Sequence, residues 1–221
     1  MNVTGMLYGA QMLRFVGFPT SEVLGPSASE EEIKGLIERH GEIFIKPVFR
    51  GGVGKKGKAG LVGRAKDLLS ALREKERLFF VEHVQAHQRA KANGVTFEGA
   101  VAAKHEVYFS ITDSTRFRAP TVTLTHVGGM DIEEVEKRHV AQVPFDSLTG
   151  LKAFVIANAL IAIEAPKEII SPLVQHLPKL WELYHDYGMT TLELNPIRMR
   201  SDRGGRLTPV ACDFKCGFDR D

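Results

Sequence analysis

The stretch IFIKPVFRGGVGKKGKAGLVG, residues 43–63, decides the fold. It opens with a short apolar run, Ile43 to Ile45, which indicates a buried strand, and it continues into glycines interspersed with lysines. Glycines allow backbone amides to approach an anion closely, and successive N–H groups can form a concave phosphate site. Because Ala59 to Gly63 indicates a second strand, we expect a β-hairpin lid folded over a triphosphate.

The residues alone leave three other interpretations of this loop open. Gly52, Gly54 and Gly57 match the dinucleotide-binding fingerprint, which requires a helix directly afterwards and an acidic residue about 20 positions further on. Residues 52–58 also resemble a Walker A loop, but Ala59 stands where a Ser or Thr should hold magnesium. A solvated basic loop that binds no ligand is the third interpretation.

A second polar pattern lies near the end of the sequence, where LELNP occupies residues 192–196 and Asp213 follows later. Glu193 and Asn195 point to the same face of a strand because side chains alternate with a period of two. An antiparallel neighbouring strand would bring Asp213 beside them. Carboxylate and amide oxygens suit magnesium, although an Asn-Pro pair by itself most often marks a turn. Together with the glycine-rich loop, the pattern predicts a grip on a magnesium–nucleotide complex.

The composition is that of an ordinary soluble protein: 221 residues, 43% hydrophobic, 25% charged, with a net charge of +2. Cys212 and Cys216 make neither a disulfide framework nor a zinc site. The longest apolar run, Ala153 to Ile163, is shorter than the roughly 20 residues that span a bilayer. With no signal peptide visible and no aromatic residues interleaved with the basic loop, we expect a cytoplasmic protein that binds neither membrane nor nucleic acid.

Hydrophobic periodicity and breaker residues predict interleaved helices and strands. The predicted helices cover residues 4–16, a segment from the Ser29–Glu32 capping box to Gly41, residues 65–75, residues 151–163, and residues 172–187 with a kink at Pro178. The predicted strands cover residues 43–45, 78–81, 107–112 (ended by Asp113), 121–126, 191–194 and 210–213, and residues 83–104 are expected to be an inserted loop. Several neighbouring strands lack a helix between them, so the pattern predicts an α+β or mixed α/β fold.

Six short motifs occur in an order that identifies a known family: FIKP at 44–47, GKAGLV at 57–62, VEHV at 81–84, GGMDIE at 128–133, LELNP at 192–196 and CDFK at 212–215. Together they resemble the ATP-grasp region of succinyl-CoA synthetase β subunits and ATP-citrate lyase, which are ADP-forming carboxylate–CoA ligases. The resemblance covers essentially the whole chain. It implies the ATP-grasp fold, in which two lobes grip the nucleotide.

The resemblance also implies roles for individual residues and two lobes. Residues 20–84 would form the N-terminal lobe with its glycine-rich lid, and residues 1–19 and 85–221 the C-terminal lobe with the magnesium site. The implied nucleotide contacts are Lys46 on the phosphates, Gly57, Lys58 and Gly60 covering them, Glu82, His83 and Val84 lining the adenine pocket between the lobes, and Glu106 near the ribose. Asn195 and Asp213 would hold Mg²⁺, and no catalytic residue is assigned within this chain.

This sequence departs from the family pattern in four places. The glycine-rich loop is longer, residues 85–104 resemble an insertion before Glu106, and Asn195 and Asp213 are separated by a longer turn. The flavodoxin-like CoA-ligase domain that follows in relatives is absent. We therefore expect a chain cut from a longer protein or a separately encoded domain.

The implied activity is that of the ATP-binding part of a larger acid–thiol ligase. Such a chain positions Mg-ATP (or Mg-GTP) for phosphoryl transfer to a histidine on an α-type partner subunit or domain, which also binds CoA and the carboxylic acid. By itself the chain would not complete the ligation. The alternatives are another ATP-grasp carboxylate ligase, such as a carboxylate–amine ligase, and a non-catalytic nucleotide-binding regulatory module. The GGMDIE and LELNP motifs favour the CoA-ligase branch.

Overall fold

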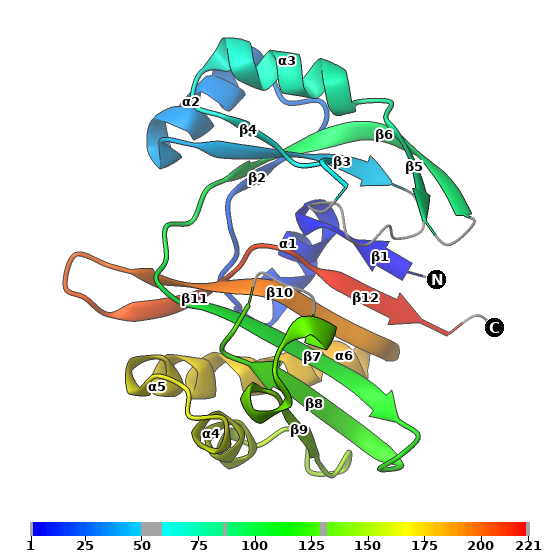
Figure 1. Ribbon diagram of the computed structural model, residues 1–221, viewed down its shortest axis with the longest axis vertical. Helices are drawn as coiled ribbons and strands as arrows, with labels where there is room; N and C mark the ends of the chain where they lie inside the picture. Colours follow the sequence, from blue (N-terminus) through cyan, green and yellow to red (C-terminus); the bar gives the residue numbers. More distant parts are fainter. Residues whose placement is uncertain (1, 50–58, 86–87, 129–131, 220–221) are drawn as a thin grey trace. The chain divides into compact units, whose positions relative to one another are not determined.

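A computed structural model describes residues 2–49, 59–85, 88–128 and 132–219, and it shows helices packed on antiparallel sheets (Figure 1). This architecture confirms the predicted α+β or mixed α/β class. The chain divides into two compact units, which are described separately. Unit 1 contains Gln11–Thr20 and the chain from Ala102 onward, and unit 2 contains Asn2–Ala10 and Ser21–Val101. The predicted lobe of residues 20–84 is shorter than unit 2.

Unit 2 is a five-stranded antiparallel sheet with the strand order β2-β6-β3-β4, and β5 pairs with β6. Helices α2 and α3 pack against one face of this sheet (Figure 1). The elements are β2 (Val23–Leu24), α2 (Glu30–His40), β3 (Ile43–Phe49), β4 (Gly63–Ala65), α3 (Leu68–Leu78), β5 (Glu82–Gln85) and β6 (Gln88–Gly99). They are preceded by β1 (Asn2–Thr4) and α1 (Met6–Phe15), and the second half of α1 is counted with unit 1.

The core of unit 2 forms where α2 and α3 meet alternate side chains of β3. Every second residue of β3 is buried, including Ile43 and Ile45, and these pack with Ile33 and Leu36 of α2. The capping box predicted at Ser29 is present: the Ser29 hydroxyl accepts the Glu32 N–H, and the Glu32 carboxylate accepts the Ser29 N–H at 2.8 Å. The hydrophobic period and the cap therefore specify this helix at the level of sequence.

Two sequence-based expectations in unit 2 were wrong. Residues 83–104 contain the 12-residue strand β6, which lies inside the sheet, and not an inserted loop. A register irregularity opposite Pro47 to Phe49, with Gly94 at φ 108°, disrupts the two-residue period and hides the strand. The apolar run 78–81 is not a strand either, because Leu78 completes α3 in the core and the next strand begins at Glu82.

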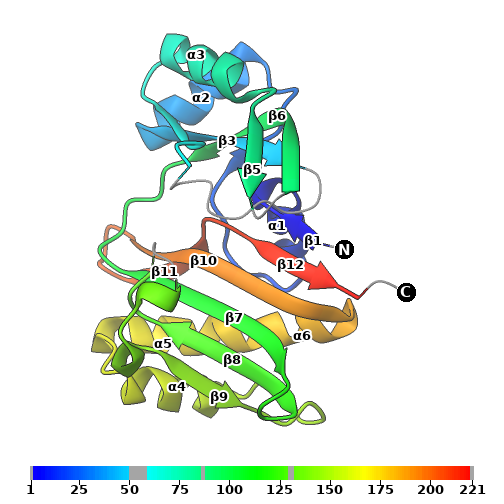
Figure 2. The same cartoon turned by 45° about the vertical axis from the view of Figure 1, so that its right-hand side comes forward.

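Unit 1 is built on antiparallel strands in the order β12-β10-β7-β8-β9, with β11 also paired to β10. Helices α4, α5 and α6 lie against one face of this sheet (Figure 1 and Figure 2). The elements are β7 (Glu106–Ser114), β8 (Ala119–Thr125), the 3₁₀ helices η1 (Ile132–Glu134) and η2 (Lys137–His139), β9 (Ala141–Pro144), α4 (Ala153–Ala162), α5 (Lys167–His176), η3 (Leu177–Lys179), α6 (Leu180–Asp186), β10 (Met189–Ser201), β11 (Leu207–Ala211) and β12 (Lys215–Phe218).

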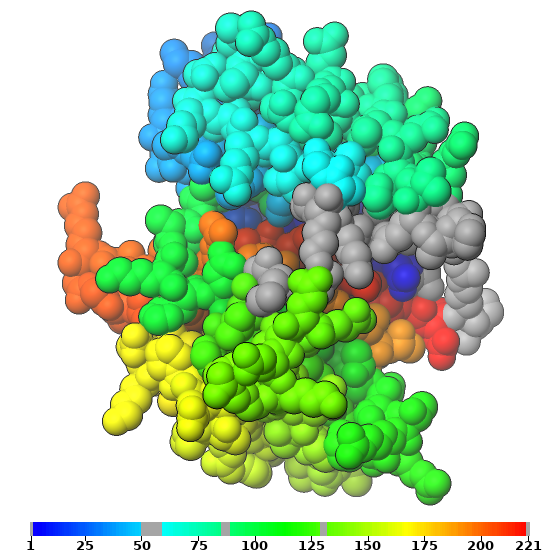
Figure 3. Space-filling model, in the orientation of Figure 1, coloured from blue at the N-terminus to red at the C-terminus, as the bar shows by residue number. Residues whose placement is uncertain are grey.

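The turn between β10 and β11 is exposed at the surface of unit 1 (orange in Figure 3).

Pro178 does break the predicted helix, because it lies in η3 between α5 and α6. The predicted start at Pro172 was wrong, since α5 begins at Lys167 and Pro172 is inside it. Asp113 does not end its strand, which continues to Ser114.

Among the described residues, no helix is both long enough and apolar enough to span a membrane.

Replacing the capping residue tests the local basis of α2. We expect Ser29→Ala to lower the free energy of unfolding by about 1 kcal/mol, because the Glu32 N–H loses its acceptor. Ser27→Ala, an exposed serine outside the cap, is the matched control and should change the free energy by less than about 0.5 kcal/mol. Urea denaturation measures both, and equal effects would contradict the role of the cap.

Candidate functional site

Strand β10 separates an apolar face from a polar face in unit 1. Leu192 and Leu194 are fully buried on the side that packs on the helices, while Glu193 and Asn195 are half-buried on the opposite side. The strand pairs with β7 along one edge and with β11 and β12 along the other. Because opposed residues of paired strands point to the same face, Ser110 of β7 and Lys215 of β12 accompany Glu193 on the polar face.

The regular alternation of β10 is interrupted at Asn195. The pairing with β7 shifts register between Leu194 and Ile197, and the two residues between them are both half-buried. After this irregularity the buried positions continue at Ile197 and Met199, one residue out of phase. Such bulges re-aim side chains and occur preferentially next to functional sites. The peptide bond between Asn195 and Pro196 is cis.

Asp213 lies alongside this irregular stretch of β10. On one side of it, the Cys212 N–H donates a hydrogen bond to the Pro196 carbonyl at 3.0 Å. On the other side, Lys215 pairs in register with Glu193. The backbone of Asp213 is therefore held opposite Leu194 and Asn195, as the sequence predicted for an antiparallel neighbour. One Asp213 carboxylate oxygen accepts the Phe214 N–H at 3.0 Å.

Asn195 and Asp213 together fit magnesium better than a metal whose ligands all come from protein side chains. One amide and one carboxylate on adjacent segments match the one or two protein ligands that Mg²⁺ takes when substrate phosphates and waters complete its shell. Within residues 2–49, 59–85, 88–128 and 132–219, no three His, Cys, Asp or Glu side chains converge as metal ligands. The residues therefore suit a cation that arrives together with an anionic ligand.

The polar face also carries a buried tyrosine that the sequence analysis did not single out. Tyr108 of β7 is 7% exposed, and burial, followed by the negative charge of Glu193, raises the pKa of its phenol to about 12. Glu193 itself pairs with Lys215 at 3.8 Å. The one signal available from sequence was the two-residue spacing from Tyr108 to Ser110, which puts both on the face of Glu193.

In unit 2, Lys46 belongs to a buried ionic cluster. Its ammonium donates a hydrogen bond to Glu98 at 2.6 Å, and the Thr96 hydroxyl donates to the other Glu98 oxygen at 3.0 Å. The Glu98 side chain is only 3% exposed. Lys46 lies opposite Thr96 in the β3–β6 register, on the face of the sheet away from the buried Ile43 and Ile45. A buried carboxylate needs such partners, and in return it fixes the position of the ammonium.

The glycine-rich lid is described only at its second end. Gly57 and Lys58 lie outside the described residues, whereas Gly60 occupies a turn with φ 68° and its carbonyl accepts a hydrogen bond from Arg77 at 3.2 Å. The chain then returns as β4, antiparallel to β3. The predicted hairpin is confirmed, although its second strand begins at Gly63 and not at Ala59. A strand at this point is incompatible with the dinucleotide fingerprint, which needs a helix.

Glu82, His83 and Val84 lie on β5, which forms a hairpin with β6 inside unit 2. The chain leaves unit 2 at Val101, so these three residues lie inside unit 2, whereas the predicted N-terminal lobe ends at residue 84. Strand β6 lies between them and the point where the chain leaves unit 2. Glu82 pairs with Arg89 across the hairpin at 3.8 Å, and Val84 is 61% exposed. Their contact with adenine stays a prediction.

Glu106 begins β7 in unit 1 and is held by two contacts. Its carboxylate pairs with Arg198 of β10 at 2.6 Å, and its carbonyl accepts the Gly128 N–H at 3.0 Å. A Cβ atom at Gly128 would come within 2.7 Å of the backbone of Glu106 and Val107. The first glycine of the GGMDIE motif is therefore required for close backbone approach to this strand.

Residues 9–199 match the family model described as the ATP-grasp domain. The chain is 25% identical over 214 residues to the β subunit of an ADP-forming succinate–CoA ligase from Desulfosudis oleivorans, covering 95% of this chain and 54% of that protein. It thus spans about half the length of this curated relative.

Two solved structures share the fold. ATP citrate lyase from Methanothrix soehngenii superposes with a TM-score of 0.66 at 21% identity, covering 90% of this chain and 44% of that one. The dinucleotide-forming acetyl-coenzyme A synthetase 1 of Ca. Korarchaeum cryptofilum superposes with a TM-score of 0.60 at 14% identity, covering 94% and 88%. The latter is described in complex with coenzyme A and Mg-AMPPCP, with a phosphohistidine segment pointing towards the nucleotide-binding site.

A double-mutant cycle tests whether Glu98 holds Lys46. We expect Lys46→Met and Glu98→Gln to show a coupling energy of about 1–3 kcal/mol in urea denaturation, because the pair is buried and charge-assisted. Lys34 and Glu38, an exposed pair at 3.9 Å on α2, serve as the control cycle and should couple by about 0.5 kcal/mol or less. A coupling for Lys46 and Glu98 no larger than the control would contradict the assignment.

Proposed function

The chain belongs to the ATP-grasp domain family, and from this premise we propose that it is the ATP-binding part of an ADP-forming carboxylate–CoA ligase. The observation that carries the proposal is the strand register that sets Asp213 beside Asn195. The similarity to a succinate–CoA ligase β subunit over 95% of the chain supports the CoA-ligase branch. The fold shared with ATP citrate lyase is consistent with it.

Lys46 and the lid would bind the nucleotide phosphates. The Lys46 ammonium is fixed by Glu98 on the face of the sheet away from α2 and α3, so it can neutralise phosphate charge without ordering a free side chain first. Gly57, Lys58 and Gly60 would add backbone N–H groups and one further charge. Glu106 would accept a hydrogen bond from the ribose at the start of β7.

Asn195 and Asp213 would hold magnesium through one amide and one carboxylate oxygen. Bound there, Mg²⁺ would neutralise phosphate charge. Phosphoryl transfer demands little covalent chemistry of the protein, so positioning and charge neutralisation are the main contributions. The bulge in β10 orients Asn195, and the bond from Cys212 to Pro196 fixes the segment that carries Asp213. The neighbouring Lys215 would keep Glu193 oriented on the same face.

The acceptor of the phosphoryl group would be a histidine on a partner. The Ca. Korarchaeum cryptofilum structure, with its phosphohistidine segment pointing towards the nucleotide-binding site, supports this assignment. The name β subunit of the succinate–CoA ligase relative supports an α-type partner that carries this histidine together with the CoA and acid sites. In this scheme the present chain binds and positions Mg-ATP, and the ligation is completed on the partner.

Magnesium dependence gives the first test of the proposed site. We expect calorimetric titration of the chain to show ATP binding that is at least about tenfold tighter with Mg²⁺ than with EDTA. Asp213→Asn should remove most of this difference and leave binding in EDTA unchanged, because the variant loses a charged metal ligand and nothing else.

The matched control is Asp186→Asn, an exposed carboxylate at the end of α6. It should retain the full magnesium effect. Equal magnesium dependence in wild type and Asp213→Asn would show that the metal is held elsewhere. Failure of the wild type to bind ATP in either condition would reject the function itself.

Lys46 gives an independent test of the phosphate contact. We expect Lys46→Ala to weaken ATP binding at least about tenfold while adenosine binding changes little, because the lost interaction is with phosphate charge. Lys34→Ala, on the exposed face of α2, is the control with the same loss of formal charge. A proportional loss of affinity for ATP and adenosine would instead indicate a disturbed fold.

A further inference from the structure

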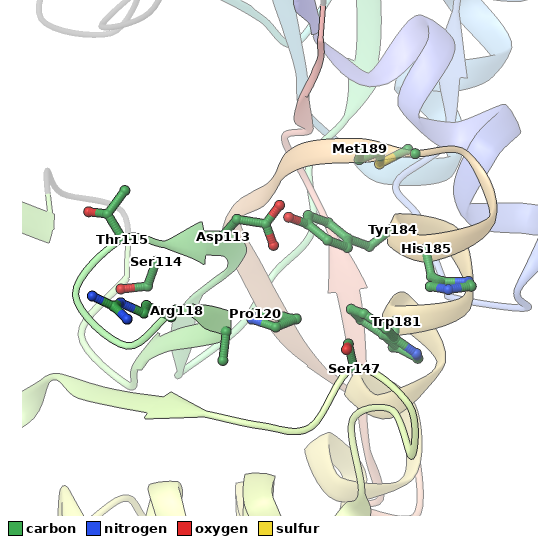
Figure 4. Close-up of a pocket in the computed structure, with 12 residues that line it drawn as sticks. Asp113, Ser114, Thr115, Arg118, Pro120, Ser147, Trp181, Tyr184, His185 and Met189 are labelled. Atoms are coloured by element: carbon green, nitrogen blue, oxygen red, sulfur yellow. The ribbon is translucent and has the colours of Figure 1, made fainter.

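Unit 1 contains a cavity of about 470 Å³ that the nucleotide and metal assignments do not use (Figure 4). It lies between the end of the β7–β8 hairpin, the loop after β9, and helix α6. Its walls include Asp113, Pro120, Ser147, Trp181, Tyr184 and Met189. The volume is in the range of small-molecule sites, which combine apolar walls with a few convergent polar groups.

Two polar groups converge in this cavity. Figure 4 shows the Asp113 carboxylate and the Tyr184 hydroxyl pointing toward one another. Tyr184 is only 4% exposed, and its hydroxyl interacts with Asp113. Burial, followed by the negative charge of Asp113, raises the pKa of the Tyr184 phenol, so the group stays neutral at physiological pH. A hydroxyl oxygen has two acceptor lone pairs and a carboxylate has more, so a bound donor can use acceptor positions on both groups.

The apolar wall is rigid before any ligand binds. Trp181 stacks on Tyr184 with ring centroids 5.7 Å apart, and Phe145 packs edge-on against Trp181 at 5.0 Å. Gly150 lies so close that an added Cβ atom would stand 2.7 Å from the indole. These contacts hold the indole in one position, which lowers the entropic cost of binding.

The chemistry of the cavity selects a particular kind of group. An ammonium has three donors and no acceptor, so it can serve the Asp113 carboxylate and the Tyr184 oxygen together. Its charge also suits the faces of Trp181 and Tyr184. The guanidinium of Arg118 lies with Ser114 and Thr115 on the side of the cavity away from Trp181 (Figure 4), and so it leaves the Asp113–Tyr184 side available to a cation.

We propose that this cavity binds a small primary amine with an apolar or aromatic body. The ammonium group contacts Asp113 and Tyr184, and the body packs on Trp181 and Pro120. The proposal is independent of the assignment of nucleotide ligands, because its residues are distinct from Lys46, Asn195 and Asp213. A small amine bound here occupies a second ligand site on unit 1.

Trp181 is the only tryptophan in the sequence, so its fluorescence reports directly on the cavity. We expect titration of the full chain with 2-phenylethylamine to give a saturable change, and its neutral analogue 2-phenylethanol to bind at least about tenfold more weakly. Asp113→Asn should reduce amine binding by a similar factor, because the exposed carboxylate loses its charge at constant shape. Tyr184→Phe should reduce it by a smaller factor.

Glu182→Gln, an exposed carboxylate on α6 that does not line the cavity, is the matched control and should bind the amine as the wild type does. The comparison of amine with alcohol uses the wild-type chain, so it decides the question even where a variant fails to fold. The absence of a saturable change with the amine overturns the proposal. Equal affinity of amine and alcohol, or of wild type and Asp113→Asn, overturns it as well.

Discussion

The arrangement of unit 1 depends on one constraint, the alternation of side chains along β10. Its buried leucines must face the helices, so Glu193 and Asn195 are forced onto the opposite face. Neighbouring strands on both edges fix this register, and a one-residue slip would exchange the two faces. The bulge at Asn195 is tolerated because burial resumes at Ile197, and it sets the segment that carries Asp213 against a distorted stretch of strand.

The sequence was informative wherever local chemistry and burial agreed. The capping box at Ser29, the hairpin that follows Lys46 and the break at Pro178 each have a local physical cause, and each is present. Strand β6 was missed because its period is broken at Gly94. Unit 2 extends to Val101, whereas the predicted N-terminal lobe ends at residue 84. Glu98 and Tyr108 were missed because their environments arise from pairing between distant segments.

The two units differ in how deeply they bury their charged side chains. A buried carboxylate, Glu98, accepts hydrogen bonds from Lys46 and Thr96, and these bonds offset the cost of burying its charge. In unit 1, Glu193 and Asp213 are half-buried and would suit a metal that brings its own anionic ligands. Under the proposed function, Lys46 of unit 2 would supply a cation for phosphate, and unit 1 would supply oxygen ligands for Mg²⁺.

The most direct test of the account is a crystal structure of the chain with a non-hydrolysable ATP analogue and Mn²⁺, in which anomalous scattering locates the metal. The account predicts a single strong peak about 2.2 Å from an oxygen of Asp213 and from the amide oxygen of Asn195, with the metal also bound to the analogue's phosphates. A metal bound to the analogue but away from both residues would contradict the central claim that Asn195 and Asp213 hold the metal.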